Sequence, residues 1–418
     1  MPEKKIIAVM GATGLQGGAV VNALLSTDEF SIRAITRNPD SDKAQALVTK
    51  GCEVVKADAD DVSSMVTAFS GAYGAFLVTN FWADMSMTHE IETTDKLRQA
   101  VSEAQVEHVV LSTLEDTRPI VNALDDKETW KMLDEAHHSY VPYMDGKGEA
   151  GQRFWESEVP VTLLFTAFYY DNFINYGMGP QQQQGEDQPL SITFPLGDTA
   201  LPMNSLHDIG GTVVSILQDP ATINTKQGVA STILTGTEIA ATFAKVLGAP
   251  VVFHAVPTEV YASFGFPGAA DLSNMFRFWG TLEDTLRTVE ATEQRLGRKT
   301  DALEAWIEVH KAAFMIVPAE NSSLDLLEQM RTVLEAERRI SDDQDINISE
   351  CEAKIAELEA THTQLKEAVA AKEGEWNTAR GKLATKGKQF DHLRAAVLAA
   401  AKAVVTGPPP TSTTSKAE

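Results

Sequence analysis

The chain has 418 residues, of which 43% are hydrophobic and 22% charged, which is typical of a globular protein of two or three domains. Its formal net charge of −24 argues against binding to nucleic-acid phosphates or to anionic membranes through bulk electrostatics. Cys52 and Cys351 are too few for a disulfide framework or a zinc site, so we expect no metal. The sequence has no long apolar run and no room for a leader before the first strand. We therefore expect a cytoplasmic protein, with access to the nucleus left open.

The most informative stretch follows an apolar, strand-like run at residues 6–10. Gly11, Gly14 and Gly17 come next at three-residue intervals, and an apolar helical pattern begins at Val20. Between a strand and a helix, the first glycine allows the chain to reverse and the second lets the backbone approach a pyrophosphate. The third lets the helix pack closely on the strand. A purely structural glycine turn is the alternative, but the flanking strand and helix favour nucleotide binding.

Residues 30–36 alternate in polarity and predict a second strand, which ends at Arg37. In dinucleotide-binding folds this strand end faces the adenosine ribose, where an arginine pairs with a 2′-phosphate and an acid repels it. Arg37 therefore favours NADP(H) over NAD(H), unless it is merely an exposed arginine at a strand end. The third strand, residues 53–57, ends at Asp58, which suits either an adenine contact or a solvated acidic turn.

Further strands and helices alternate along the next hundred residues. Helices are predicted at residues 62–69 and 93–104, and strands at 74–80, 108–113 and 161–165. This alternation predicts an α/β fold with a doubly wound parallel sheet, the Rossmann class. We expect a domain over residues 1–317, with its Rossmann core at about 1–175. A smaller α+β lobe at about 176–317 would close over the carboxyl edge of the sheet.

Four motifs in this order resemble the NmrA-like family. They are the glycine-rich turn at residues 11–18 and the segments 36–39, 145–149 and 274–278. The sequence is most similar to the NADPH redox-sensor branch of these atypical short-chain dehydrogenases, over about residues 4–317. The resemblance implies a Rossmann domain that binds NADP(H) and acts as a cofactor-state sensor. Such a sensor regulates partner proteins without demonstrated turnover.

The resemblance also implies a set of cofactor contacts. It places Gly11, Ala12, Thr13, Gly14, Leu15, Gln16 and Gly17 at the pyrophosphate, Arg37 and Asn38 at the 2′-phosphate, Asp58 and Ala59 at the adenine, Thr79, Asn80 and Phe81 beside the ribose or nicotinamide, Lys147 at the nicotinamide ribose, and Phe168, Tyr169, Tyr170 and Asp171 along the nicotinamide end. The chain departs from the family at Glu92, where a lysine is expected. This departure puts part of the electrostatic grip on the cofactor in doubt.

Tyr143 and Lys147 raise an enzymatic alternative, because short-chain dehydrogenases use such a pair with a Ser or Thr from the fifth strand, here Ser112 or Thr113. The lysine holds the ribose and lowers the pKa of the tyrosine, which then donates a proton. Pro142 and the nearby glycines predict that the helix begins at or after Tyr143, so that its side chain misses the turn of Lys147. We therefore favour a sensor. NADPH-dependent reduction of a small carbonyl or quinone is the alternative.

The composition changes after Pro318 to Ala, Glu, Lys and Leu. Mostly apolar residues at alternating intervals of three and four, from Ile348 to Val404, predict a heptad seam of about eight repeats, which His362, Lys372 and Lys386 weaken. We expect a coiled coil within residues 318–405 that joins two copies of the chain or binds a partner protein. A long helix folded back on the lobes is the alternative. Residues 406–418 are predicted to be disordered.

Overall fold

The structure, a computed structural model, describes residues 4–182, 189–282 and 286–314. These residues lie in the first of the two units into which the chain divides, Met1–Val317. The predicted coiled coil at residues 318–405 and the tail at 406–418 lie outside the described residues. Within the described ranges, no helix is both long and apolar enough to cross a membrane.

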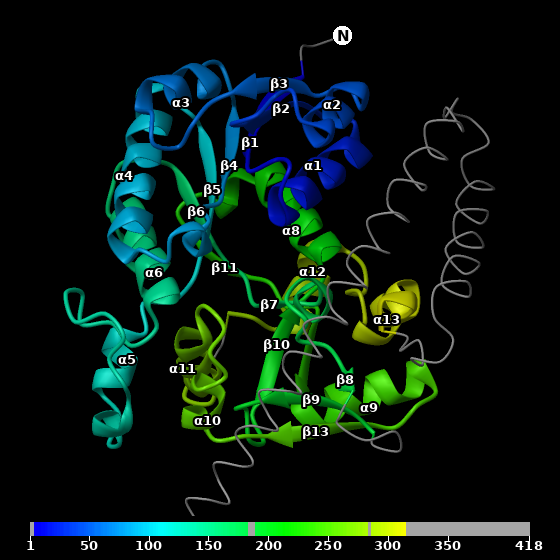
Figure 1. Cartoon of the computed structure of the whole chain (residues 1–418). Helices are drawn as coiled ribbons and strands as arrows, with labels where there is room; N and C mark the ends of the chain where they lie inside the picture. Colours follow the sequence, from blue (N-terminus) through cyan, green and yellow to red (C-terminus); the bar gives the residue numbers. More distant parts are fainter. Residues whose placement is uncertain (1–3, 183–188, 283–285, 315–418) are drawn as a thin grey trace, which may run out of the picture. The chain divides into compact units, whose positions relative to one another are not determined.

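The centre of the unit is a seven-stranded sheet in the order β11-β6-β5-β4-β1-β2-β3, and every pairing in it is parallel (Figure 1). Its strands are β1 (Lys5–Met10), β2 (Phe30–Thr36), β3 (Glu53–Lys56), β4 (Gly74–Leu77), β5 (His108–Thr113), β6 (Val161–Phe165) and β11 (Lys226–Gly228). The strand order reverses between β1 and β4, which makes their carboxyl ends the switch point where such sheets bind ligands. The predicted doubly wound Rossmann fold is confirmed.

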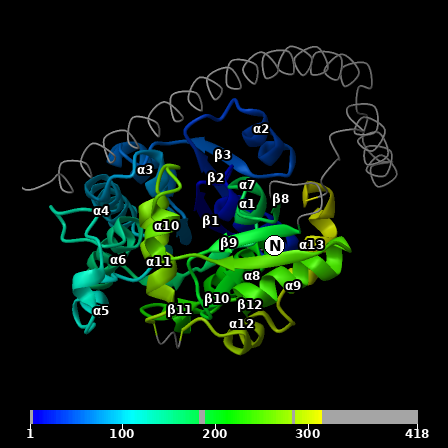
Figure 2. The same ribbon diagram turned by 60° about the horizontal axis from the view of Figure 1, so that its bottom comes forward.

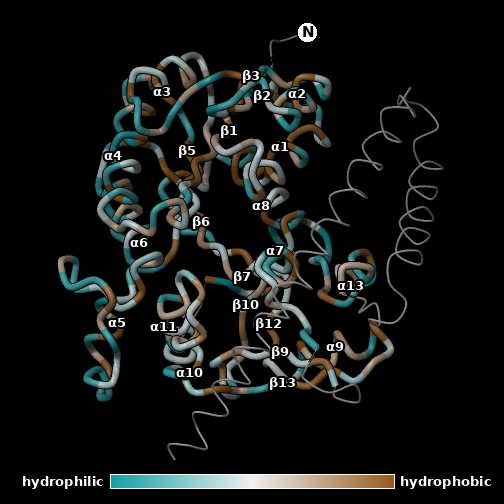
Figure 3. Tube along the Cα trace, in the orientation of Figure 1, coloured by the Kyte–Doolittle hydropathy of each residue, from teal (hydrophilic) through white to brown (hydrophobic). Residues whose placement is uncertain are grey.

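Helices cover both faces of this sheet. One face carries α1 (Leu15–Thr27), α2 (Asp42–Thr49) and α8 (Leu206–Gln218), and the other carries α3 (Val62–Phe69), α4 (Met87–Glu103) and α6 (Pro142–Trp155). Because both faces are covered, β5 and β6 are buried along their whole length, and seven of their eleven residues are apolar. Figure 3 shows these inner strands in brown, whereas α4 carries hydrophilic teal segments.

The lobe lies beyond the carboxyl edge of the sheet and contains two three-stranded sheets, β12-β10-β7 and β13-β9-β8. Its strands are β7 (Phe168–Tyr169), β8 (Gln181–Gln182), β9 (Leu190–Phe194), β10 (Ala200–Asn204), β12 (Thr232–Thr235) and β13 (Val251–Ala255). Its helices are α7 (Asn172–Asn175), α9 (Gly236–Leu247), α10 (Thr258–Ala262), α11 (Ala269–Trp279), α12 (Val289–Leu296) and α13 (Leu303–His310). Figure 2 brings this lobe forward and shows α9 along β13.

Two features differ from the sequence prediction. α6 begins at Pro142, so Tyr143 lies inside the first turn of the helix, and the expectation that the helix starts at or after Tyr143 was wrong. Proline is well suited to this first position because its missing N–H has no helical partner there. The segment between β5 and α6 also contains a short helix, α5 (Arg118–Asn122). Finally, α8 packs against α1 and β11 joins the central sheet, so the chain returns to the Rossmann part after residue 205.

Candidate cofactor site

The glycine-rich turn joins β1 to α1 at the switch point. Gly11 has a φ of +65°, in the left-handed region, and its carbonyl accepts a hydrogen bond from the Gly14 N–H at 2.8 Å. A Cβ atom on Gly17 would lie 2.2 Å from the Gly11 carbonyl oxygen, so only glycine allows α1 to sit this close to the turn. Gly14 caps α1 without a side-chain hydrogen bond. The N–H groups at the start of α1 therefore face outward with no side-chain acceptor, as an anion site requires.

Arg37 lies directly beyond β2, two strands along the edge from β4. Its side chain is exposed, and among the described residues it has no hydrogen-bond or ion-pair partner. Its neighbour Asn38 is engaged within its own turn, because Oδ1 accepts from the Asp40 N–H at 3.2 Å. Arg37 is thus a cation available to an anionic ligand.

The segment after β3 forms an acidic turn with internal hydrogen bonds. The Asp58 carboxylate accepts from the Asp60 N–H at 3.1 Å, and Ala59 is partly buried between them. Asp60 in turn accepts from Lys96 at 2.8 Å and from His89 at 3.1 Å, and these bonds lower the pKa of Asp60 to about 2. Asp58 is exposed and uses one carboxylate oxygen in this turn, so the adenine contact stays a prediction beside the solvated acidic turn.

Lys147 reaches across from α6 to the carboxyl end of β4. Its ammonium donates to the Thr79 carbonyl at 3.1 Å, to Thr79 Oγ1 at 2.7 Å and to Glu90 Oε1 at 2.8 Å. The Thr79 hydroxyl itself donates to Glu90. Asn80 is exposed beside this group and Phe81 is buried under it. Lys147 is therefore held at the switch point, within reach of a ligand bound there.

Tyr143 lies one helical turn before Lys147, but its phenol has a different environment. The ring packs against Trp82, with ring centroids 5.1 Å apart, and against Phe81 at 6.3 Å. Burial, and secondarily the nearby charge of Asp271, raise the pKa of Tyr143 well above its usual value. The phenol therefore keeps its proton. It is a hydrogen-bond donor rather than an acid that a lysine has activated.

The two hydroxyl residues at the end of β5 have different roles. Thr113 Oγ1 donates to the Lys147 carbonyl at 2.8 Å and faces Gly151, where a Cβ atom would come within 2.7 Å. Thr113 thus holds α6 close to the sheet. Ser112 is buried. Because it precedes Thr113 in the strand, its side chain points to the opposite face of the sheet.

The segment predicted to line the nicotinamide end divides between two environments. The Tyr169 hydroxyl accepts from the Gln16 amide, which joins the lobe to the glycine-rich turn. Phe168 lies in the aromatic core of the lobe, and Tyr170 is fully buried with its hydroxyl bonded inside the lobe. Asp171 has one buried carboxylate oxygen with no hydrogen-bond partner among the described residues, and burial raises the pKa of this carboxyl. Of these four, Tyr169 is the side chain that contacts the glycine-rich turn.

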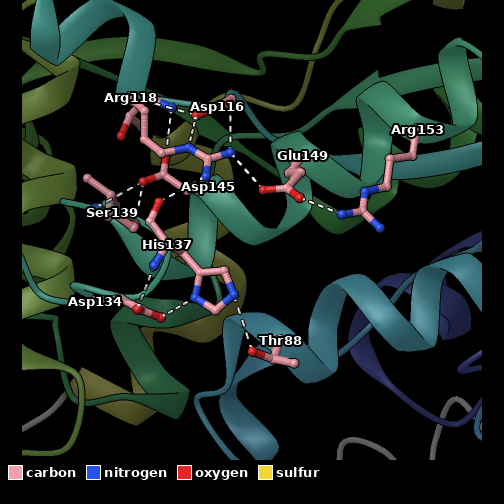
Figure 4. Close-up of polar contacts among 11 residues, drawn as sticks. Thr88, Asp116, Arg118, Asp134, His137, Ser139, Asp145, Glu149 and Arg153 are labelled. Atoms are coloured by element: carbon pink, nitrogen blue, oxygen red, sulfur yellow. Dashed lines mark hydrogen bonds and ion pairs between the residues drawn. The ribbon is translucent and has the colours of Figure 1, made fainter.

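A buried carboxylate of the 145–149 segment, to which the sequence assigned no role of its own, fixes the loop after β5. Asp145 on α6 accepts from the Thr117 N–H at 2.6 Å and from the Ser139 hydroxyl (Figure 4). Nearby, Arg118 pairs with Asp116 at 2.8 Å and with Glu149 at 2.9 Å. The signal available beforehand was weak, because an acid in the first turn of a helix is common on electrostatic grounds alone.

One cluster within the described residues has the composition of a metal site. His207, Asp208 and Asp301 bring one ligand atom each to within 4.8 Å of one another. Arg298 Nη2, however, lies 2.8 Å from Asp208 Oδ1, and Nη1 lies 3.4 Å from Asp301 Oδ1. The guanidinium pairs with both carboxylates, so we interpret the cluster as an ion-pair network.

The parallel sheet, the glycine-rich turn at its switch point and the adjoining lobe together define a Rossmann-fold protein of the doubly wound class. A model of the NmrA-like family matches residues 3–309, and the chain belongs to this family.

Curated relatives carry the same family description. The NmrA-like family domain-containing oxidoreductase FrzB of Cladobotryum sp is 32% identical over 296 residues, covering 66% of this chain and 84% of the relative. The oxidoreductase lnaB of Aspergillus flavus is 27% identical over 325 residues, covering 71% of this chain and 92% of the relative.

Solved structures share the fold at lower identity. NmrA, a negative transcriptional regulator in complex with NADP, has a TM-score of 0.61 and 19% identity, covering 75% of this chain and 98% of that one. The triphenylmethane reductase of Citrobacter sp., complexed with NADP(H), has a TM-score of 0.58 and 23% identity, covering 74% and 100%. The NADPH-dependent quinone oxidoreductase of Escherichia coli has a TM-score of 0.56 and 21% identity, covering 73% and 99%. At these identities the likeness establishes the fold.

Proposed function

We propose that this protein binds NADP(H) at the carboxyl edge of its central sheet and uses it to reduce a small carbonyl or quinone. The observation that carries the cofactor proposal is the Arg37 guanidinium beyond β2, which has no partner among the described residues. The start of α1, which has no side-chain cap, agrees with it. The forked guanidinium of an arginine binds a 2′-phosphate through two hydrogen bonds. The end of β2 carries no acid that would repel this phosphate. The oxidoreductase names of the curated relatives support the reductase.

The residues present fit such a cofactor at three points. The N–H groups at the start of α1 would hold the pyrophosphate, Arg37 the 2′-phosphate, and Lys147 the nicotinamide ribose. NADPH supplies a hydride when it is bound. The protein supplies position and hydrogen bonds, because Lys147 is fixed by Thr79 and Glu90 and the protonated Tyr143 phenol offers a donor to a substrate oxygen.

A second candidate function is the cofactor-state sensor. The hydrogen bond between Tyr169 and Gln16 favours it, because this bond connects the lobe to the glycine-rich turn. A pyrophosphate bound at the turn would contact Gln16 and so displace or reorient a residue of β7. In this alternative the lobe changes position with cofactor occupancy and alters a protein partnership.

The two candidates separate in one experiment. Purified protein is incubated with NADPH and a panel of aldehydes, ketones and quinones, and the absorbance of NADPH is followed. The reductase proposal predicts turnover with at least one acceptor. Tight NADPH binding without turnover would favour the sensor, and absence of NADPH binding would contradict both.

A further inference from the structure

Glu90 is a buried carboxylate on α4 that neither the glycine-rich turn nor the Tyr143–Lys147 pair explains. The residue is 5% exposed, and its Oε1 accepts from the Lys147 ammonium at 2.8 Å and from the Thr79 hydroxyl. Gly146 on α6 faces it, and a Cβ atom there would come within 3.3 Å of Glu90 Cγ. The absence of a side chain at residue 146 thus leaves room for the Glu90 side chain between the two helices.

The Lys147 ammonium and the Glu90 carboxylate carry opposite charges in a poorly hydrated place. The Lys147 side chain is 14% exposed and that of Glu90 is 2% exposed, so either charge alone would lose much of its hydration. A buried lysine without a counter-ion releases its proton at lower pH than an exposed one. Together the two side chains form a hydrogen-bonded ion pair.

The other charged groups around Lys147 are engaged elsewhere. On α6, Glu149 pairs with Arg118 and Arg153, and Asp145 accepts hydrogen bonds from Thr117 and Ser139. In the segment after β5, Glu115 pairs with Arg287 and Asp116 pairs with Arg118. On α4, His89 bonds Asp60 and Asp84, and on α11, Asp271 accepts from the Tyr143 N–H. Tyr143 keeps its proton and carries no charge at neutral pH. Within the described residues, Glu90 is the carboxylate bonded to Lys147.

We infer that Glu90 is a positioning residue that pairs with Lys147 and aims its ammonium at the carboxyl end of β4. This inference rests on the proposed function, in which Lys147 binds the nicotinamide ribose. A ribose hydroxyl can replace Thr79 as a partner of the ammonium, because Thr79 is a neutral ligand. Glu90 remains bonded in both states, so the protein binds the cofactor without burying a new uncompensated charge.

The test is the pH dependence of NADPH affinity in Glu90→Gln. NADPH dissociation constants are measured by fluorescence from about pH 7, above the range in which a 2′-phosphate titrates, to about pH 9.5. In the wild-type protein Glu90 pairs with Lys147, and the affinity is expected to change less than about threefold over this range. In Glu90→Gln the buried lysine loses its proton within the range, and the affinity is expected to fall at least about tenfold as the pH rises. Glu103→Gln, at an exposed glutamate on the same helix, is the matched control and should follow the wild type.

Two further variants assign the effect to Lys147. Lys147→Met should bind NADPH weakly at every pH, and the double variant with Glu90→Gln should be no weaker than Lys147→Met alone. If Glu90→Gln does not fold, Glu90→Asp, which keeps the carboxylate on a shorter side chain, should fold and retain a flat profile.

A flat profile in folded Glu90→Gln, or a pH-dependent one in Glu90→Asp, would overturn the inference. Wild-type affinity in Lys147→Met would instead contradict the proposed role of Lys147 in cofactor binding.

Discussion

Replacing Gly17 by alanine tests the geometry of the glycine-rich turn. The added Cβ atom would lie 2.2 Å from the Gly11 carbonyl oxygen, 2.5 Å from the Gly11 carbonyl carbon and 2.7 Å from the Met10 oxygen. A carbon–oxygen contact needs roughly 3.3 Å, so α1 or the turn must move by about 1 Å. Overpacking of this kind costs about 1–3 kcal/mol, whereas alanine in place of glycine gains up to about 1 kcal/mol of helix propensity. The net effect is a loss of stability.

The matched control is Gly18→Ala, one residue further along the same helix. There the added Cβ atom would lie 3.4 Å from the Ala12 carbonyl oxygen, an ordinary contact. We expect Gly18→Ala to melt at the wild-type temperature or slightly above it. Gly17→Ala should melt several degrees lower and bind NADPH at least about tenfold more weakly, because the N–H groups of α1 move away from the pyrophosphate. Thermal melts and NADPH titrations measure both effects. Equal behaviour of the two variants would refute this account of the turn.

Arg37→Gln removes the cation proposed for the 2′-phosphate and should weaken NADPH binding about ten- to hundredfold while leaving NADH binding nearly unchanged, as measured by fluorescence titration. If Tyr143 donates one neutral hydrogen bond, Tyr143→Phe should lower kcat/KM by less than about tenfold. Tyr73→Phe, at the opposite edge of the sheet, is the control. A loss of a hundredfold or more in Tyr143→Phe would instead identify Tyr143 as a general acid. Burial raises the pKa of Asp271 well above its unfolded value, so the stability that the protonated form contributes is present in acid and is lost as the pH rises through the folded pKa. Asp271→Asn does not titrate, so its melting temperature should improve relative to that of the wild type from about pH 4 to pH 8. A constant difference between the two melting temperatures would contradict this. Removal of residues 318–418 should reduce the number of chains per particle, measured by light scattering, if the predicted heptad seam joins two chains, and an unchanged oligomeric state would contradict the coiled coil.

Much of the Rossmann part could be predicted because local pattern and long-range packing agree there. The strand at Ile7, the glycines and the alternation of strands with helices all follow from the sequence period and from turn chemistry. β11 could not be found in this way, because Lys226, Gln227 and Gly228 form a polar three-residue strand that exists only by pairing with β6.

The candidate site was harder to predict where the decisive contacts join distant segments. The Lys147–Glu90 pair spans 57 residues, and no spacing rule connects a residue of α4 to one of α6. Tyr143 shows the converse problem, because its position relative to Lys147 in the sequence is that of a catalytic pair. The Tyr143 ring packs against Trp82, and burial raises the pKa of its phenol, whereas the sequence pattern of a catalytic pair suggests a lowered pKa.

The central claim is that the switch point binds NADP(H), and calorimetric titration of the wild-type protein with NADPH and NADH at one ionic strength tests it directly. The account predicts one site per chain and an affinity for NADPH at least about tenfold higher than for NADH, because Arg37 pairs with the 2′-phosphate. Equal affinities, or no heat of binding with either nucleotide, would contradict it.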